Sequence, residues 1–211
     1  MSGSKATRPQ IILIGGGDSY TQREDFLAAL RTQPLRDAPS DEPYVSWRQH
    51  FVAELEAEYW IDIPQMPNKQ NARYDEWQIW FQRHLELVER EVILIGLSLG
   101  AMFLVKYLLK EPASAAVRHL FLLAGPCGSC DDGTGNDCSD FAFAPADLPQ
   151  LTAQVGGITI MHSTDDFVVP YQHAERYAAA LPQAELVTFT DKNHFLIPEF
   201  PELIERVRAV M

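Results

Sequence analysis

Ser98 lies at the centre of a Gly-Leu-Ser-Leu-Gly pentapeptide at residues 96–100, a pattern that suits a nucleophilic serine. An apolar run at residues 92–95 precedes it, and a helical pattern at residues 99–109 follows it. When such a pentapeptide joins a buried strand to a helix, its glycines permit a cramped turn that raises the serine hydroxyl above the strand end. On the motif alone, an ordinary turn with a solvated serine remains the alternative.

His194 is the best candidate for the general base that a serine hydroxyl requires. It lies in a loop between the last apolar run, at residues 185–189, and the last helical pattern, at residues 199–210. The order Ser, acid, His along the chain is that of hydrolases built on an α/β sheet. His162 keeps a smaller claim because it stands at the end of an apolar run. The other histidines are better explained as helix, strand or loop residues: His50, His84, His119 and His173.

Asp165 and Asp166 follow the apolar run at residues 157–161, and either could be the acid that such a histidine needs. A buried carboxylate beside the imidazole fixes its tautomer and stabilises the cation that forms on proton uptake. The other aspartate would cap the loop or face solvent. Spacing alone leaves the choice between the two open.

Three consecutive glycines, at residues 15–17, follow the first apolar run and let the backbone approach a ligand closely. We expect the N–H of Gly16 or Gly17, together with that of Leu99, to stabilise the oxyanion of a tetrahedral intermediate. A phosphate-binding loop is the alternative. It is disfavoured because Tyr20 replaces the last glycine of Gly-x-Gly-x-x-Gly and because no Gly-Lys-Ser/Thr sequence follows.

The elements that would position these residues alternate between apolar runs and helical patterns, which predicts a doubly wound α/β fold. The runs are continuous, as is typical of parallel strands covered on both faces. We therefore predict a mostly parallel six-stranded sheet in the flavodoxin-like order 2-1-3-4-5-6. The strands are expected at residues 10–14, 58–63, 92–95, 117–123, 157–161 and 185–189. The helices are expected at residues 45–57, 74–90, 99–109, 171–181 and 199–210.

Two segments without a regular pattern, residues 19–43 and 125–149, each follow a predicted strand. Ligands bind at the carboxyl edge of open α/β sheets, so we expect both segments to form loops at the edge of the active site. The first contains a short helix candidate at residues 23–31 and is expected to form part of a lid or of the acyl-pocket wall.

The composition fits one globular domain at residues 1–211 and argues against several classes of partner. The chain carries 17 Lys and Arg against 29 Asp and Glu, a formal net charge of −12. Nucleic acids and anionic membranes favour basic surfaces, so neither is expected as a partner. No apolar run suits a transmembrane helix, and residues 1–9 resemble a flexible tail rather than a signal peptide. We expect a cytoplasmic protein with a small-molecule substrate, and the sequence gives no support for a protein partner.

Cys127, Cys130 and Cys138 are clustered and odd in number, which does not indicate a secreted disulfide framework. A zinc site would need a fourth ligand, and the spacing matches no strong zinc pattern. A solvent-facing thiol cluster or a Cys127–Cys130 disulfide is favoured over a metal or redox site.

Together these residues resemble the α/β-hydrolase fold, and more narrowly the family of small serine hydrolases related to the retinoblastoma-binding serine hydrolase. The resemblance covers most of the chain in patches. These are the strand and glycine loop at residues 11–18, the helix around Trp47, the paired Trp77 and Trp80, residues 95–101, and residues 163–204, which are the most specific part.

In that family the catalytic aspartate stands four residues before a proline, so the resemblance chooses Asp166, four residues before Pro170, over Asp165. It also implies Ser98 as nucleophile, His194 as general base, a short sheet without a large cap, and neither metal nor cofactor. The implied activity is cleavage of a small ester, thioester or amide through an acyl-enzyme. The alternative is a protein-interaction module with vestigial or slow activity.

Leu97 and Asn193 depart from the family pattern. Leu97 replaces the usual histidine beside the nucleophile, and we expect it to contact the substrate together with Asp18 and Val168. Asn193 replaces the glycine that commonly precedes the histidine, and asparagine tolerates a left-handed backbone better than most residues with a side chain. The 19–43 segment is longer than the family leads us to expect.

Overall fold

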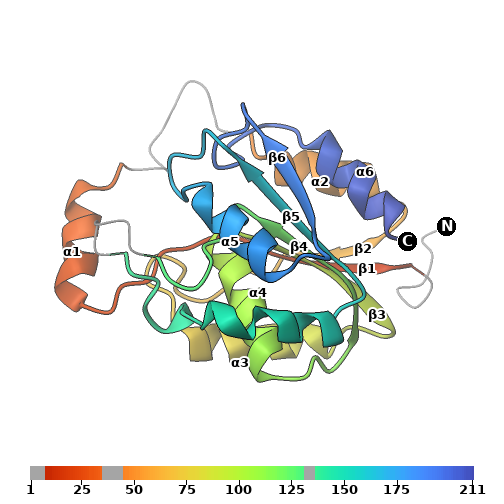
Figure 1. The fold of residues 1–211 in the computed structure, drawn as a ribbon, viewed down its shortest axis with the longest axis horizontal. Coiled ribbons are helices and arrows are strands. Elements are labelled where there is room, and N and C mark those ends of the chain that lie inside the picture. The colour runs from red at the N-terminus through yellow and green to blue at the C-terminus, as the bar shows by residue number, and fades with distance from the viewer. Residues whose placement is uncertain (1–7, 35–44, 131–135) are drawn as a thin grey trace.

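Six parallel strands form one sheet in the computed structural model, which describes residues 8–34, 45–130 and 136–211 (Figure 1). The order across the sheet is β2-β1-β3-β4-β5-β6, which confirms the predicted order. Every neighbouring pair is parallel, so all six carboxyl ends meet at one edge. The strands are β1 (Gln10–Ile14), β2 (Trp60–Asp62), β3 (Glu91–Leu97), β4 (Ala116–Leu123), β5 (Ile158–Ser163) and β6 (Glu185–Phe189).

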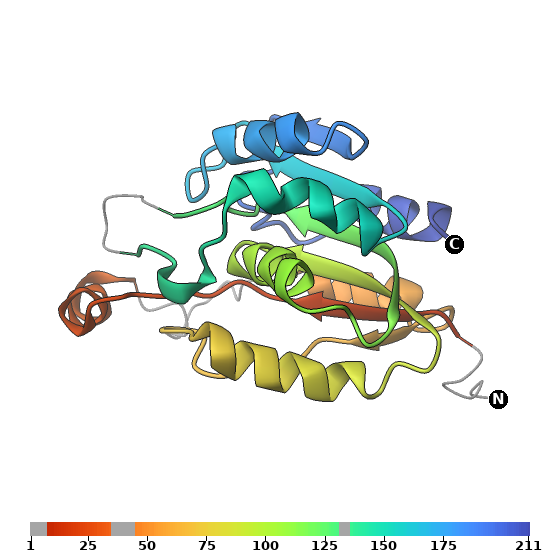
Figure 2. The same cartoon turned by 60° about the horizontal axis from the view of Figure 1, so that its bottom comes forward.

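Helices cover both faces of this sheet, which explains why its central strands are mostly apolar (Figures 1 and 2). Along β1, Ile11 and Leu13 pack into the core beneath α2 and α6, whereas Ile12 and Ile14 pack into the core beneath α3, α4 and α5. Alternate residues of one strand thus build two cores. The helices are α1 (Arg23–Thr32), α2 (Trp47–Leu55), α3 (Tyr74–Leu85), α4 (Leu99–Lys110), α5 (Gln172–Ala180) and α6 (Pro201–Ala209).

Aromatic contacts fasten two of the edge loops to these cores. Phe195 stacks on Phe200 with ring centroids 4.7 Å apart, and Phe200 meets Trp47 of α2 edge-on at 5.7 Å. On the other face, Phe141 meets Trp77 of α3 edge-on at 5.2 Å. Because such ring pairs add to the stability gained from burial, the loops that carry Phe195 and Phe141 are held in fixed positions.

The 125–149 segment contains more regular structure than predicted. The residues Ser139–Phe141 and Pro145–Ala153 form two 3₁₀ helices, the second of which starts at Pro145 and includes Pro149. Its buried residues, Leu148 and Leu151, are three apart, which is the period of a 3₁₀ helix. Two prolines in nine residues hide this pattern when an α-helical period is sought, so the prediction of an irregular segment was wrong there.

The helix α1 stands beyond the carboxyl edge of the sheet and buries none of its residues (Figure 1). It matches the short helix predicted at residues 23–31, while residues 35–44 of the same predicted segment lie outside the described part of the chain. Across the residues that the structure describes, every helix is too short or too polar to span a membrane.

Candidate active site

Ser98 stands at the turn between β3 and α4 in a strained backbone conformation, with φ 55° and ψ −125°. A positive φ is unfavourable for a residue with a side chain, and such strain is concentrated at functional sites. The flanking glycines permit the turn. A Cβ on Gly96 would lie 2.5 Å from the Cα of Ala101, and one on Gly100 would lie 2.6 Å from the carbonyl oxygen of Gly15. The pentapeptide therefore adopts the sharp strand-to-helix turn that its spacing predicts.

The glycine loop after β1 passes directly beside Ser98. A Cβ on Gly16 would lie 3.1 Å from the Ser98 Cβ and 3.5 Å from its Oγ. A Cβ on Gly17 would lie 2.6 Å from the carbonyl oxygen of Lys69, so this loop can only follow its path as glycine. On the other side, Leu99 is the first residue of α4, where backbone N–H groups have no partner within the helix. The structure thus brings the predicted oxyanion donors and the serine together.

Asp166 and His194 meet at the ends of β5 and β6, with 2.8 Å between Asp166 Oδ2 and His194 Nδ1. The Asp166 carboxylate is fully buried, and its Oδ1 accepts the backbone N–H groups of Val168 at 2.8 Å and Val169 at 2.9 Å. Burial alone would raise the pKa of Asp166, but hydrogen bonds from His162, His194 and the backbone outweigh it and hold the pKa below its ordinary value of 3.8. The ionised carboxylate only accepts hydrogen bonds, so His194 carries a proton on Nδ1.

His162, on β5, is a second histidine that contacts the Asp166 carboxylate. Its Nε2 lies 2.8 Å from the carbonyl oxygen of Val169 and 3.3 Å from Asp166 Oδ2. Because a carbonyl oxygen only accepts, this nitrogen carries a proton that the two oxygens share. The ring is 1% exposed and packs edge-on against Tyr171 at 5.8 Å. Its place at a strand end, four residues before Asp166, is the sequence signal from which this supporting role could have been predicted.

Asp165 fastens the aspartate loop to the histidine loop. Its Oδ1 accepts the Asn193 N–H at 2.9 Å and also the hydroxyl of Ser163. Asn193 has φ 40°, the left-handed backbone expected at the position before His194. Asp165 therefore caps the loop, which is one of the two roles predicted for the aspartate that does not bind the histidine.

Ser98 lines a cavity of about 90 Å³ at the carboxyl edge of the sheet. Asp18 and Val168, both expected to contact the substrate, line it as well, and so does Leu99. Leu97 does not line this cavity, because its side chain packs into the core beneath α2 and α6. The remaining lining residues are Gly17, Pro126, Cys130, Asn136, Cys138, Val169, Pro170 and His173.

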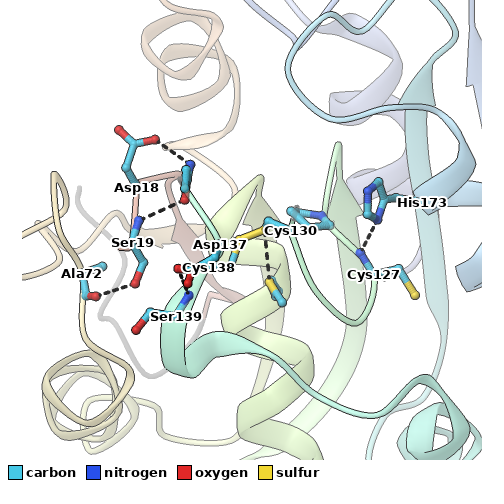
Figure 3. Close-up of a disulfide and its surroundings, with 12 residues drawn as sticks. Asp18, Ser19, Ala72, Cys127, Cys130, Asp137, Cys138, Ser139 and His173 are labelled. Carbon is cyan, nitrogen blue, oxygen red and sulfur yellow. Dashed lines mark hydrogen bonds between the residues drawn. A yellow bond between two sulfur atoms is a disulfide. The ribbon is translucent and has the colours of Figure 1, made fainter. Parts of the chain in front are cut away.

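A disulfide between Cys130 and Cys138 forms part of the cavity wall (Figure 3). Between these cysteines in the sequence, Asn136 accepts the Ser19 N–H at 3.3 Å and donates to Asp18 Oδ1 at 3.2 Å. The disulfide loop is therefore fastened to the chain that follows the glycine loop. Nothing in the spacing of these residues predicts the contact, because no periodic pattern determines the path of the loop.

Cys127 is not part of a solvent-facing cluster and does not pair with Cys130, so both predictions for the cysteines were wrong. It is 1% exposed and free, and burial raises the pKa of its thiol to about 11 against the opposing charge of Arg176. Its N–H donates to Nδ1 of His173 at 2.9 Å, and burial followed by the Arg176 charge lowers the pKa of that histidine (Figure 3). Cys127 lies four residues after the end of β4, and Cys138 is the cysteine that pairs with Cys130.

Of the two predicted edge segments, only the second supplies part of the cavity wall among the described residues. Pro126, Cys130, Asn136 and Cys138 all come from residues 125–149. From the described part of the 19–43 segment, no residue lines the cavity, although its first residues touch the disulfide loop. Among residues 8–34, 45–130 and 136–211, no group of three or more His, Cys, Asp or Glu side chains is placed to hold a metal ion.

The chain is similar in sequence to known serine hydrolases. A model of the serine hydrolase family matches residues 40–203. Serine hydrolase RBBP9 of Rattus norvegicus is 30% identical over 147 residues, which are 69% of this chain and 75% of the rat protein.

Solved structures are similar across nearly the whole chain. The ydeN gene product from B. subtilis has a TM-score of 0.75 at 17% identity, with 96% of this chain and 98% of that chain covered. A meta-cleavage product hydrolase from Pseudomonas fluorescens IP01 has a TM-score of 0.64 at 15% identity, with 96% and 90% covered. At such low identity these two likenesses speak for the fold alone, which is the α/β-hydrolase fold. With the family model matching most of its length, the chain belongs to the serine hydrolase family.

Proposed function

We propose that the protein cleaves a small carboxylic ester, thioester or amide through an acyl-enzyme on Ser98. The observation that carries this proposal is the buried hydrogen bond between Asp166 and His194, at the edge where Ser98 lines a cavity. The three residues follow β3, β5 and β6, so one rigid sheet supports all of them. Val168 and Val169, whose N–H groups bind Asp166, line the same cavity as Ser98, which supports a single site.

His194 is the general base of the first half-reaction. Its Nδ1 proton is held by Asp166, which leaves the Nε2 lone pair to take the proton of the Ser98 hydroxyl as Oγ attacks the carbonyl carbon. The ionised Asp166 stabilises the resulting imidazolium. His194 then returns the proton to the leaving alcohol, thiol or amine, and the acyl group stays on Ser98.

Water completes the cycle in the second half-reaction. It gives a proton to His194 and attacks the acyl carbonyl, which releases the carboxylic acid and restores the Ser98 hydroxyl. An oxyanion forms in each half-reaction, beside the N–H of Leu99 and that of Gly16 or Gly17. Loss of one such donor lowers kcat by about 10²–10³-fold in serine hydrolases of known mechanism.

The cavity favours a short substrate group of mixed polarity. The side chains of Leu99, Val168 and Pro126 offer apolar contact, while Asn136 and His173 offer polar groups. A cavity of about 90 Å³ suits a small acyl or leaving group better than a long chain.

A panel of p-nitrophenyl esters, thioesters and aminoacyl anilides, run on the wild type and on Ser98→Ala, tests the proposal. We expect saturable turnover of short substrates by the wild type and none above background by the variant. If the folded wild type turned over no member of the panel and bound no fluorophosphonate probe, the interaction-module alternative would replace the enzyme.

A further inference from the structure

His173, the second residue of α5, lines the same cavity as Ser98. We propose that His173 determines specificity, because its Nε2–H donates a hydrogen bond to an uncharged oxygen in the acyl group of the substrate. The proposal rests on the function proposed above and adds the chemical class of the acyl group, which is a short chain with an uncharged hydrogen-bond acceptor.

The hydrogen bond from Cys127 determines which nitrogen of His173 carries the proton. The backbone N–H of Cys127 donates to His173 Nδ1 at 2.9 Å, so Nδ1 is an acceptor and carries no proton (Figure 3). The proton of the neutral ring is therefore on Nε2. His194 has the opposite tautomer, because Asp166 holds its proton on Nδ1. The site thus contains one histidine that accepts at Nε2 and one that donates there.

His173 carries no charge at neutral pH. Burial, followed by the positive charge of Arg176, lowers the pKa of His173 below its ordinary value of 6.5. A neutral imidazole donates a hydrogen bond to a substrate oxygen in other enzymes, where it polarises a carbonyl group. The ring of His173 is therefore suited to an uncharged oxygen rather than to an ion pair.

Two hydrogen bonds fasten α5 to the chain beside the cavity. Tyr177 follows His173 by one helical turn, and its buried hydroxyl donates to the carbonyl oxygen of Pro126 at 2.7 Å. Pro126 precedes Cys127, whose N–H binds His173, and it also lines the cavity. Because the two contacts hold the His173 ring in one orientation, little conformational entropy is lost when Nε2–H binds an oxygen.

The Nε2 atom of His173 is available to a ligand. It makes no hydrogen bond to any residue that the structure describes, and it is not sealed from solvent. Small-molecule sites bind mainly through apolar contacts and select their ligands through a few fixed polar groups. In this cavity Leu99 and Val168 offer the apolar contact, and the Nε2–H of His173 is one such polar group.

His173 lies on the side of the site where the acyl group is expected. In the proposed reaction His194 protonates the leaving group, so the leaving group must lie beside His194 and the acyl chain away from it. Phe195, which follows His194, packs into the core beneath α2 and α6. Ala174, which follows His173, packs into the core beneath α3, α4 and α5. The two histidines therefore flank the site from opposite faces of the sheet.

The test compares p-nitrophenyl esters in pairs whose acyl chains have equal length and differ by one ether oxygen. Methoxyacetate is paired with butyrate, and β-methoxypropionate with valerate, so that the oxygen is offered at two positions. The quantity measured is the ratio of kcat/KM for the ether ester to kcat/KM for its alkyl partner. The intrinsic reactivity of each ester cancels when this ratio is compared between protein variants.

His173→Asn keeps an amide oxygen for the Cys127 N–H but has no donor at the position of Nε2. We expect it to lower the ratio of at least one pair about three- to tenfold, which is the worth of one hydrogen bond between neutral groups. His173→Gln places an amide NH₂ near the position of Nε2 and should restore part of the ratio. Gln172→Asn is the matched control, because Gln172 is the exposed neighbour of His173 on α5, and it should leave both ratios unchanged. A purely structural role of His173 would lower kcat/KM for both members of a pair equally.

NMR of the histidine ring nitrogens examines His173 without turnover. We expect the proton on Nε2, and we expect methoxyacetone to shift the Nε2 signal and to bind the wild type more tightly than methyl propyl ketone does. A preference for methoxyacetone that is lost in His173→Asn and kept in Gln172→Asn supports the inference, even if no ester is hydrolysed and the proposed function fails. A proton on Nδ1, or hydrolysis of each ester pair with one ratio in all four proteins, would overturn the inference and leave the hydrolase function standing.

Discussion

Replacing Asp166 by asparagine should nearly abolish turnover, whereas replacing the adjacent Asp165 should not. The two side chains differ in what they hold: Asp166 binds His194 at 2.8 Å, and Asp165 binds the Asn193 N–H at 2.9 Å. The same change of one oxygen to an NH₂ group therefore acts on the general base in one variant and on a loop contact in the other.

The structure decides which way the asparagine amide turns. Two backbone N–H groups, of Val168 and Val169, point at Oδ1 and cannot become acceptors, so the amide oxygen stays there and the NH₂ group faces His194. His194 must then accept at Nδ1 and carry its proton on Nε2, where it cannot take a proton from Ser98. Such a tautomer error lowers kcat by about 10⁴-fold in a known serine protease.

The assay is kcat/KM for the best p-nitrophenyl ester, with circular dichroism and urea unfolding to show that each variant is folded. We expect Asp166→Asn to lose about 10⁴-fold and Asp165→Asn to lose less than about tenfold, since the second change weakens only hydrogen bonds between loops. If Asp166→Asn kept more than about a tenth of the activity, or Asp165→Asn fell as far as Asp166→Asn, the assignment of the acid would be wrong.

Three further outcomes follow from the same contacts. Gly100→Ala should lower the free energy of unfolding by at least about 2 kcal/mol in urea, because its Cβ would meet backbone oxygens; a variant as stable as the wild type would contradict the elbow geometry. Iodoacetamide should label Cys127 only after unfolding and the Cys130–Cys138 pair only after reduction, as read by intact mass; label on the native protein would refute the burial of the thiol or the disulfide. The pKa of Asp166 is lower in the folded protein than its unfolded value near 3.8, so the ionised carboxylate stabilises the fold above that pH. The free energy of unfolding should therefore fall more steeply below about pH 4 in the wild type than in Asp166→Asn. Urea unfolding at a series of acid pH values measures this dependence, and an equal dependence on pH in the two proteins would count against the lowered pKa.

The strands and their order could be predicted because burial on both faces of a parallel sheet leaves a plain signal. Val92 to Leu97 and Leu120 to Leu123 are apolar at every position except glycine, and helical patterns separate such runs. Ser98 and His194 could be proposed from the sequence because their positions follow from the ends of those strands. Leu97 also adjoins the serine in sequence, but the alternation of side chains along β3 sends it into the core.

Contacts between loops could not be predicted, because they depend on paths that no residue pattern determines. Asp165 and Asp166 are adjacent and chemically equal, and only the turn of the backbone decides which of them is buried against His194. The pairing of Cys130 with Cys138 likewise depends on how the loop bends, as does the contact of Asn136 with the chain after the glycine loop.

The most direct test of the account is the site at which a fluorophosphonate probe reacts. Wild-type protein and Ser98→Ala are incubated with the probe, and the modified peptide is located by mass spectrometry after digestion. The account predicts one adduct, on Ser98, which forms in the wild type and is absent from the variant. An adduct on another residue, or none on a wild-type protein whose fold is intact, would contradict the claim that Ser98 is the nucleophile.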